Sequence, residues 1–190
     1  MILAESELKK AIAACDLEFD PPVDDAQIGP ASIDLRLSNE FLLIHTVLEA
    51  QRAAGVVSAI DLDTYSFDKF RKAFARRRKV RSSGYFEIEP GRLVLGYTME
   101  LVRLSSTLFA RVEGKSSLAR LGLFVHITAP TVQPGFENHL QLELLNVGPM
   151  PIRLRPGKPI CQLIVERVEG SGVYAGQFQR SRRLSARASA

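Results

Sequence analysis

Short segments in which apolar and polar residues alternate constrain this chain more than any other feature. In "SIDLRL", the apolar Ile33, Leu35 and Leu37 alternate with polar residues, which is the pattern of a half-buried strand. Similar segments follow in "YFEIEPGRLVLGYTMELVRL", "LFARVEG", "FVHITAPTVQPGFENHLQLELLNVG" and "PIRLRPGKPICQLIVERV". Because Gly and Pro turns separate them, the sequence predicts a mainly β fold, a sandwich or distorted barrel of short strands with a few short helices.

Composition bounds the size and the compartment of the protein. A chain of 190 residues, 46% hydrophobic and 24% charged, fits one globular domain with a sizeable core. Glu5, Glu7, Lys9 and Lys10 lie in its first segment, which excludes a signal peptide, and no apolar run reaches the length of a membrane span. Two widely spaced cysteines do not form a disulfide framework, so we expect free thiols, a cytoplasmic protein and no membrane partner.

Basic residues are concentrated in two regions, residues 69–81 and 180–187. Phe67, Phe70 and Phe74 recur at helical spacing in the first region, so the sequence predicts an amphipathic helix whose basic outer face extends over 69–81. A formal net charge of +4 permits a polyanionic partner. No helix-turn-helix, zinc-finger or RNA-binding aromatic motif accompanies these regions, so we favour a solvated face and expect no nucleic-acid partner.

The stretch "GKSSLARLGLF", residues 114–124, places a lysine, two hydroxyl groups and an arginine between two glycines. Gly114 indicates a turn and Gly122 a helix C-cap, with Ser116 or Ser117 capping the short helix between them. Backbone N–H groups and hydroxyl groups at such a helix start can bind an anion. The alternative is a short capped helix that carries surface charges and binds nothing.

The stretch "HLQLELLNV" predicts a strand that carries a carboxylate in its middle. Leu140, Leu142 and Leu144 face one way, and Gln141 and Glu143 face the other. Glutamate is depleted in strands. If another subunit covers this face, Glu143 can take and return a proton during a reaction. The alternative is a strand carboxylate that faces solvent.

Five blocks, in order, carry a resemblance to a known family: "MILAESEL", "IGPASIDLRLSNEF", "EPGRLVLGYTMELVRL", "ARVEGKSSLARLGLFVH" and "QPGFENHLQLEL". Together they resemble the dCTP deaminase family of the dUTPase-like β-clip superfamily. The similarity runs from Met1 to about Val168 and weakens between about Thr46 and Ser83. "ARVEGKSSLARLGL" is its most specific block.

The resemblance implies a dUTPase-like β-clip domain over residues 1–169 and a homotrimer with active sites shared between subunits. It also implies metal-free, hydrolytic deamination of dCTP to dUTP and ammonia, with Mg²⁺ accompanying only the substrate triphosphate. By match to the family's motifs, the catalytic positions are Glu143, Ser116, Arg120 and the backbone carbonyl of Ala129. The matching substrate-binding positions are Lys115, Ser117, Gln133, Phe136, Gln141, Leu142, Tyr174 and Gln177.

This assignment gives the reaction a simple chemistry. Deamination needs a water that attacks C4, a proton for N3 and a proton for the leaving amine, and one carboxyl group can shuttle all three. Lys115 and Ser117 match positions beside the phosphates. Phe136 matches a position under the deoxyribose. The backbone of Gln141 and Leu142 matches positions that read the cytosine edge. Zinc deaminases instead carry H-x-E and P-C-x-x-C signatures, which this sequence lacks.

Two departures from the family pattern leave alternatives open. Gln133 replaces an aspartate that holds the sugar 3′-hydroxyl, and Val173 replaces a lysine in the basic C-terminal tail, residues 170–190. That tail is expected to close over the active site through Tyr174 and Gln177. The alternatives are a non-catalytic nucleotide-binding relative, a dUTP pyrophosphatase and a bifunctional deaminase-pyrophosphatase.

Overall fold

Antiparallel strands are the main regular elements of the structure, a computed structural model that describes residues 1–44, 60–64 and 66–176. The helices are α1 (Glu5–Ala13), the 3-10 helix η1 (Asp25–Gln27), α3 (Phe67–Phe74) and α4 (Ser116–Ala119). The strands are β1 (Leu17–Asp20), β2 (Ile33–Ile44), β3 (Ala75–Lys79), β4 (Phe86–Ile88), β5 (Leu93–Leu104), β6 (Leu108–Gly114), β7 (Leu123–Phe124), β8 (Thr131–Val132), β9 (Glu137–Asn146), β10 (Ile152–Leu154) and β11 (Pro159–Arg167). The prediction of a mainly β fold with a few short helices is confirmed.

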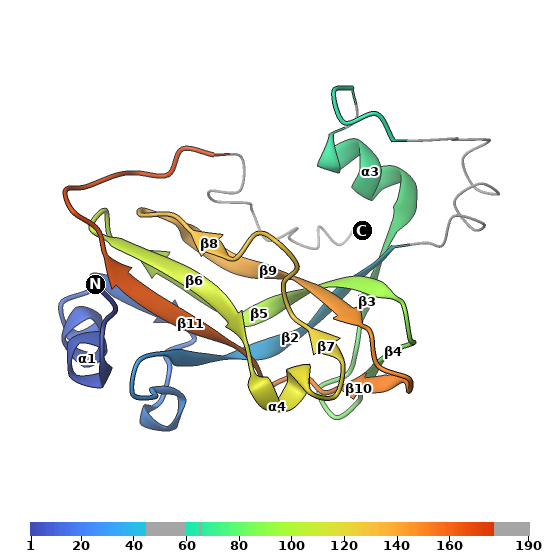
Figure 1. The fold of residues 1–190 in the computed structure, drawn as a ribbon, viewed down its shortest axis with the longest axis horizontal. Helices are drawn as coiled ribbons and strands as arrows, with labels where there is room; N and C mark the ends of the chain where they lie inside the picture. Colours follow the sequence, from blue (N-terminus) through green and yellow to red (C-terminus); the bar gives the residue numbers. More distant parts are fainter. Residues whose placement is uncertain (45–59, 65, 177–190) are drawn as a thin grey trace, which may run out of the picture.

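Within the described residues, nine strands form one curled sheet (Figure 1). Its order is β7-β9-β5-β2-β11-β6-β8, with β1 added beside β5 and β3 added beside β2. Strands β4 and β10 form a separate pair. None of the helices in this part of the chain is both long enough and apolar enough to cross a membrane.

Alternating side chains of the long strands fill the core. Ile33, Leu35 and Leu37 of β2 are buried, as the pattern of "SIDLRL" predicts. The strand continues to Ile44 and pairs in turn with β11, β5 and β3. Phe41 of β2 stacks on Phe86 of β4, with ring centroids 4.3 Å apart, and so packs the small sheet against the large one.

The predicted basic helix is correct only in its first part. Helix α3 ends at Phe74, and the next residues form β3, an edge strand paired with β2. Strand pairing supplies partners for the backbone of Ala75–Lys79, and Glu40 of β2 lies 3.9 Å from Arg77 and 3.4 Å from Lys79. These contacts with a distant part of the chain override the helical periodicity of the phenylalanines.

Candidate active site

Glu143 lies in the middle of β9 with its side chain on the outer side of the sheet. Its neighbours Leu142 and Leu144 are fully buried, so the alternation predicted for this strand is confirmed. The Glu143 carboxylate is half-buried, and its Oε2 accepts a hydrogen bond from the main-chain N–H of Ile127 at 3.0 Å. This bond ties β9 to the loop that separates β7 from β8.

That loop carries Ala129, which is exposed two residues beyond the N–H donor of Ile127. Its far end is held by a hydrogen bond of 2.8 Å from the Val112 N–H of β6 to the Pro130 carbonyl. Both ends of the loop are therefore fixed to strands. The arrangement places the Ala129 backbone and the Glu143 carboxylate in the same part of the molecule.

Helix α4 begins immediately after Lys115 and presents the other candidate polar groups. Lys115 is the N-cap residue, and neither Ser116 nor Ser117 caps the helix, which corrects the sequence-based prediction. The break in helical conformation falls at Lys115, whose φ and ψ are −90° and 126°, so Ser116 already lies in the first turn. Ser116, Ser117 and Arg120 are exposed.

Gly122 ends the turn that follows α4, whereas the C-cap of the helix is Arg120, two residues earlier than predicted. Gly122 has a φ of 92°, and its N–H donates to the Ala119 carbonyl at 2.9 Å. A Cβ atom at this position would lie 2.4 Å from the backbone nitrogen of Gly148, so only glycine fits. The turn is thereby held against the turn between β9 and β10, beside the end of the strand that carries Glu143.

Lys115 has a specific partner that the sequence did not reveal. Its Nζ lies 2.6 Å from Oδ1 and 2.6 Å from Oδ2 of Asp34 in β2. Its side chain therefore points back to the sheet. The position of Asp34 on the polar side of "SIDLRL" is visible in the sequence, but its pairing with Lys115 is not.

A second group of candidate residues surrounds the turn that precedes β9. Gln133 is exposed, and its carbonyl accepts a hydrogen bond from the Phe136 N–H at 3.2 Å. The Tyr174 N–H donates to the Pro134 carbonyl at 2.8 Å, and the rings of Phe136 and Tyr174 lie 6.3 Å apart, centroid to centroid. The described part of the tail thus covers this turn, whereas Gln177 lies outside the described residues.

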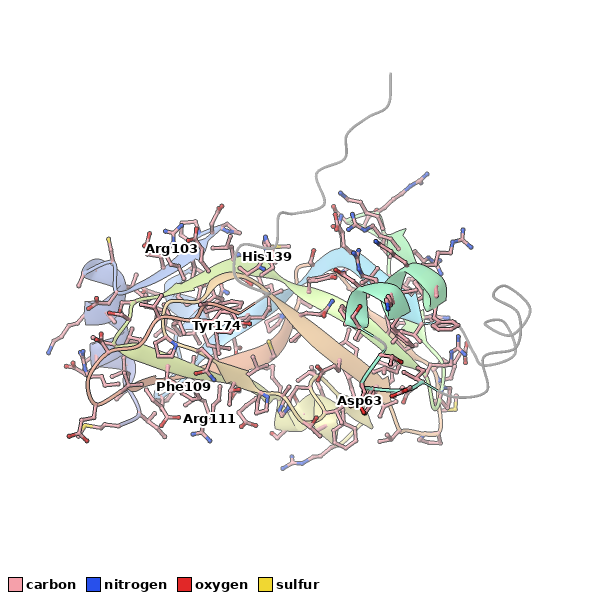
Figure 2. All side chains as sticks on the ribbon, turned by 90° about the horizontal axis from the view of Figure 1, so that it is seen from above. Asp63, Arg103, Phe109, Arg111, His139 and Tyr174 are labelled. Carbon is pink, nitrogen blue, oxygen red and sulfur yellow. The ribbon has the colours of Figure 1, made fainter. Side chains whose placement is uncertain are left out.

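Close packing of the tail depends on Gly135. This residue has a φ of 76°, and a Cβ atom there would lie 3.2 Å from Cγ1 of Val173. Figure 2 shows Tyr174 between the side of the molecule that carries Arg103 and His139 and the side that carries Phe109 and Arg111. The rings of Tyr174 and Phe136 therefore lie near each other within a single chain.

Gln141 and Leu142 occupy consecutive positions of β9 with opposite orientations. Leu142 is fully buried, whereas the exposed Gln141 donates a hydrogen bond from Nε2 to the Tyr97 hydroxyl at 2.8 Å. Tyr97 lies directly opposite Gln141 on β5, and burial raises the pKa of its hydroxyl group. Sequence reasoning missed Tyr97, although its place in an alternating segment was visible.

One chain does not bring all of the candidate residues together. Phe136 and Glu143 are separated along one extended segment, so their Cα atoms lie roughly 23 Å apart at about 3.3 Å per residue. Within the described part of the chain, no hydrogen bond or ion pair joins Glu143 to Ser116 or Arg120. The turn at Phe136, the Glu143 carboxylate and the polar residues of α4 are therefore not joined into one site by direct hydrogen bonds within the described part of one chain.

The mainly β fold with its curled sheet is also found in a solved protein. The solved 2′-deoxycytidine 5′-triphosphate deaminase from Agrobacterium tumefaciens has this fold, with a TM-score of 0.65 and 24% identity to this chain. The match covers 88% of this chain and 48% of that one, so this chain spans about half its length. The likeness establishes the fold class.

Sequence comparison establishes the family. A family model described as dCTP deaminase-like matches residues 2–168, and the chain therefore belongs to the dCTP deaminase-like family. A "dCTP deaminase, dUMP-forming" of Sulfurihydrogenibium sp. (strain YO3AOP1) is 38% identical over 189 residues, covering 98% of this chain and 96% of that protein. A "dCTP deaminase" of Rhodospirillum rubrum is 35% identical over 168 residues, covering 87% of this chain and 82% of that protein.

Proposed function

We propose that this protein deaminates dCTP hydrolytically to dUTP and ammonia, with Glu143 activating the attacking water. One observation carries the proposal: the Glu143 carboxylate is bound to the main chain of the loop that contains Ala129. A water between this carboxylate and the Ala129 carbonyl has a proton acceptor on one side and a fixed backbone dipole on the other. Membership of the dCTP deaminase-like family supports the choice of substrate.

The proposed mechanism uses Glu143 as the only proton shuttle. The water oxygen attacks C4 of the cytosine ring while the carboxylate takes a proton from that water. The carboxylate then passes this proton to N3. It then takes the second proton from the attacking oxygen and delivers it to the amino group, which leaves as ammonia. Ser116 and Arg120 complete the hydrogen bonds to the water, and Mg²⁺ enters with the triphosphate.

We infer that the complete site is assembled from more than one subunit of a homotrimer. No hydrogen bond or ion pair joins Glu143 to the exposed Ser116 or Arg120 within the described residues, although the reaction needs these groups near one water. In this trimer, Lys115 and Ser117, which lie beside Ser116, supply the contacts with the phosphates. Phe136 and Gln133 supply the sugar contacts, and Tyr174 of the tail closes over the triphosphate. The backbone of Gln141 and Leu142 reads the base edge.

A second candidate function is a bifunctional enzyme that also removes pyrophosphate. It is favoured by the names of several relatives, including the protein from Sulfurihydrogenibium and one from Methanosphaera stadtmanae, both called "dCTP deaminase, dUMP-forming". Gln133 opposes it in this chain, because an amide cannot activate a water for attack on the phosphate chain.

The deciding experiment incubates the purified protein with dCTP and Mg²⁺, and separately with dUTP and Mg²⁺. Ammonia, pyrophosphate and the nucleotides are measured over time. We expect ammonia and dUTP from dCTP, and no reaction of dUTP. Formation of dUMP identifies the bifunctional enzyme, whereas a protein that binds dCTP without releasing ammonia is the non-catalytic relative.

A further inference from the structure

The ion pair between Asp34 and Lys115 joins two parts of the chain that are 81 residues apart. Both side chains are largely shielded from water, with exposed fractions of 25% for Asp34 and 21% for Lys115. The Lys115 Nζ lies at the same short distance from both carboxylate oxygens. The pair is therefore unlike the solvent-exposed ion pairs of α1, and its ammonium group has one defined position.

The strand that carries Asp34 is itself fixed by a buried network. The Asp34 carbonyl accepts a hydrogen bond of 2.8 Å from Nε2 of Gln27, and the same Nε2 lies 3.2 Å from Oε1 of Glu100. Gln27 and Glu100 are both buried. On its other side, Asp34 is paired in the sheet with Gln162 of β11. The carboxylate of Asp34 thus projects from a rigid frame.

We propose that Asp34 is a positioning residue for the substrate triphosphate, which it serves by holding the Lys115 ammonium group in place. This inference rests on the proposed function, in which Lys115 lies beside the phosphates. A lysine has a flexible stem and three N–H donors. Asp34 engages the ammonium group through both oxygens, which fixes the stem and leaves donor capacity free for a phosphate oxygen.

The placement has an energetic consequence for binding. A free lysine side chain loses its rotational freedom each time it contacts a ligand, whereas a lysine already held by Asp34 has lost it on folding. The benefit belongs to substrate binding and not to the chemical step, because Asp34 is proposed to act on the phosphates through Lys115. Its removal should therefore change KM and leave kcat nearly unchanged.

The test is a double-mutant cycle with Asp34→Asn, Lys115→Met and the double variant, read as kcat and KM for dCTP. Asn keeps the size of Asp34 and removes its charge. We expect Asp34→Asn to raise KM on the order of 10-fold, with kcat within about threefold of the wild type. On the Lys115→Met background, Asp34→Asn should add less than about twofold.

Glu87→Gln is the matched control, because it breaks another short ion pair, 2.7 Å from Arg153, in the separate β4–β10 sheet. It should leave KM unchanged. Equal effects of Asp34→Asn with and without Lys115 would overturn the proposal, since they would show a purely structural role. A lower KM in Asp34→Asn would also overturn it, by showing that Asp34 competes with the triphosphate for Lys115.

Binding measurements separate this proposal from the proposed function. Titration calorimetry with dUTP and Mg²⁺ gives dissociation constants for the same four proteins without any reaction. If the wild type binds dUTP but releases no ammonia from dCTP, the proposed activity fails, and the cycle is read from the dissociation constants with the same expected ratios. If the wild type neither binds dUTP nor releases ammonia from dCTP, both proposals are wrong.

Discussion

The main-chain N–H of Ile127 donates a hydrogen bond to Oε2 of Glu143, at 3.0 Å, and thereby fixes the orientation of the proposed catalytic carboxylate. A glutamine at position 143 can still accept this bond through its amide oxygen, but it cannot shuttle a proton. We expect Glu143→Gln to lower kcat for dCTP by at least about 100-fold, with nucleotide binding and folding retained. Stopped-time assays of ammonia release measure the change, and near-normal turnover would refute the mechanism.

The second prediction concerns the turn at Gln133, which we propose to contact the sugar. Replacing this exposed residue with aspartate makes the expected contact with the 3′-hydroxyl charge-assisted. The binding free energy should improve by roughly 1 kcal/mol, and KM for dCTP should fall accordingly. The wild type should accumulate dUTP as its end product. Chromatography of the nucleotides follows both expectations, and accumulation of dUMP by the wild-type protein would show that Gln133 does not block phosphate-chain cleavage.

The third prediction concerns assembly. Light scattering should give three times the 21.0 kDa mass of one chain. Glu143→Gln and Arg120→Ala homotrimers should each be nearly inactive, whereas coexpression of the two variants should restore measurable ammonia release, because hybrid sites combine an intact Glu143 with an intact Arg120 from a neighbour. A stable monomer that deaminates dCTP, or inactive hybrids in confirmed mixed trimers, would contradict the shared-site arrangement.

The fourth prediction concerns Glu100, whose side chain is fully buried on β5. Its Oε1 lies 2.6 Å from Nε of Arg36, and its Oε2 accepts the Arg36 main-chain N–H at 2.9 Å. Glu100→Gln removes the charge that compensates the guanidinium group, so we expect a loss of about 3–5 kcal/mol in the free energy of unfolding. Urea titration measures the loss, with Glu87→Gln as the surface control. If Glu100→Gln and the control lower the free energy of unfolding by similar amounts, Glu100 does not stabilise the fold by compensating the charge of Arg36.

The fifth prediction concerns Cys15, which has a φ of 58° immediately after helix α1. Its N–H donates to the Ile12 carbonyl and the Asp16 N–H donates to the Ala11 carbonyl, the Schellman arrangement in which glycine is preferred. Cys15→Gly should therefore raise the free energy of unfolding by about 1 kcal/mol under reducing conditions. Cys15→Ala keeps the strain and should give no such gain, and a lower urea midpoint for Cys15→Gly would contradict the prediction.

Sequence reasoning succeeded where the structure is set by local alternation. The burial of Leu35 on β2 and of Leu142 on β9 follows from a side-chain period of two, which a single strand displays by itself. The helical spacing of Phe67, Phe70 and Phe74 likewise predicted α3 from the sequence. Its continuation beyond Phe74 was predicted wrongly, because pairing of β3 with β2 depends on residues far away in the chain.

The same limit applies to the candidate site. Glu143 and the α4 residues stand out from their own neighbours and from the family motifs. The partnership of Lys115 with Asp34, and that of Tyr97 with Gln141, arises only when distant strands are placed side by side. Glu100 carried a usable signal, since it shares a strand face with Val102 and Leu104, which marks a carboxylate directed into the core.

Strand β3 has a consequence for how copies of this protein meet. It is an edge strand whose consecutive residues Arg76, Arg77, Arg78 and Lys79 are all exposed, so both of its faces are cationic. An approaching edge from a second copy meets like charge before any backbone hydrogen bond can form. This edge of the sheet is thereby protected from pairing with the same edge of a second copy, which is a route to open-ended aggregation.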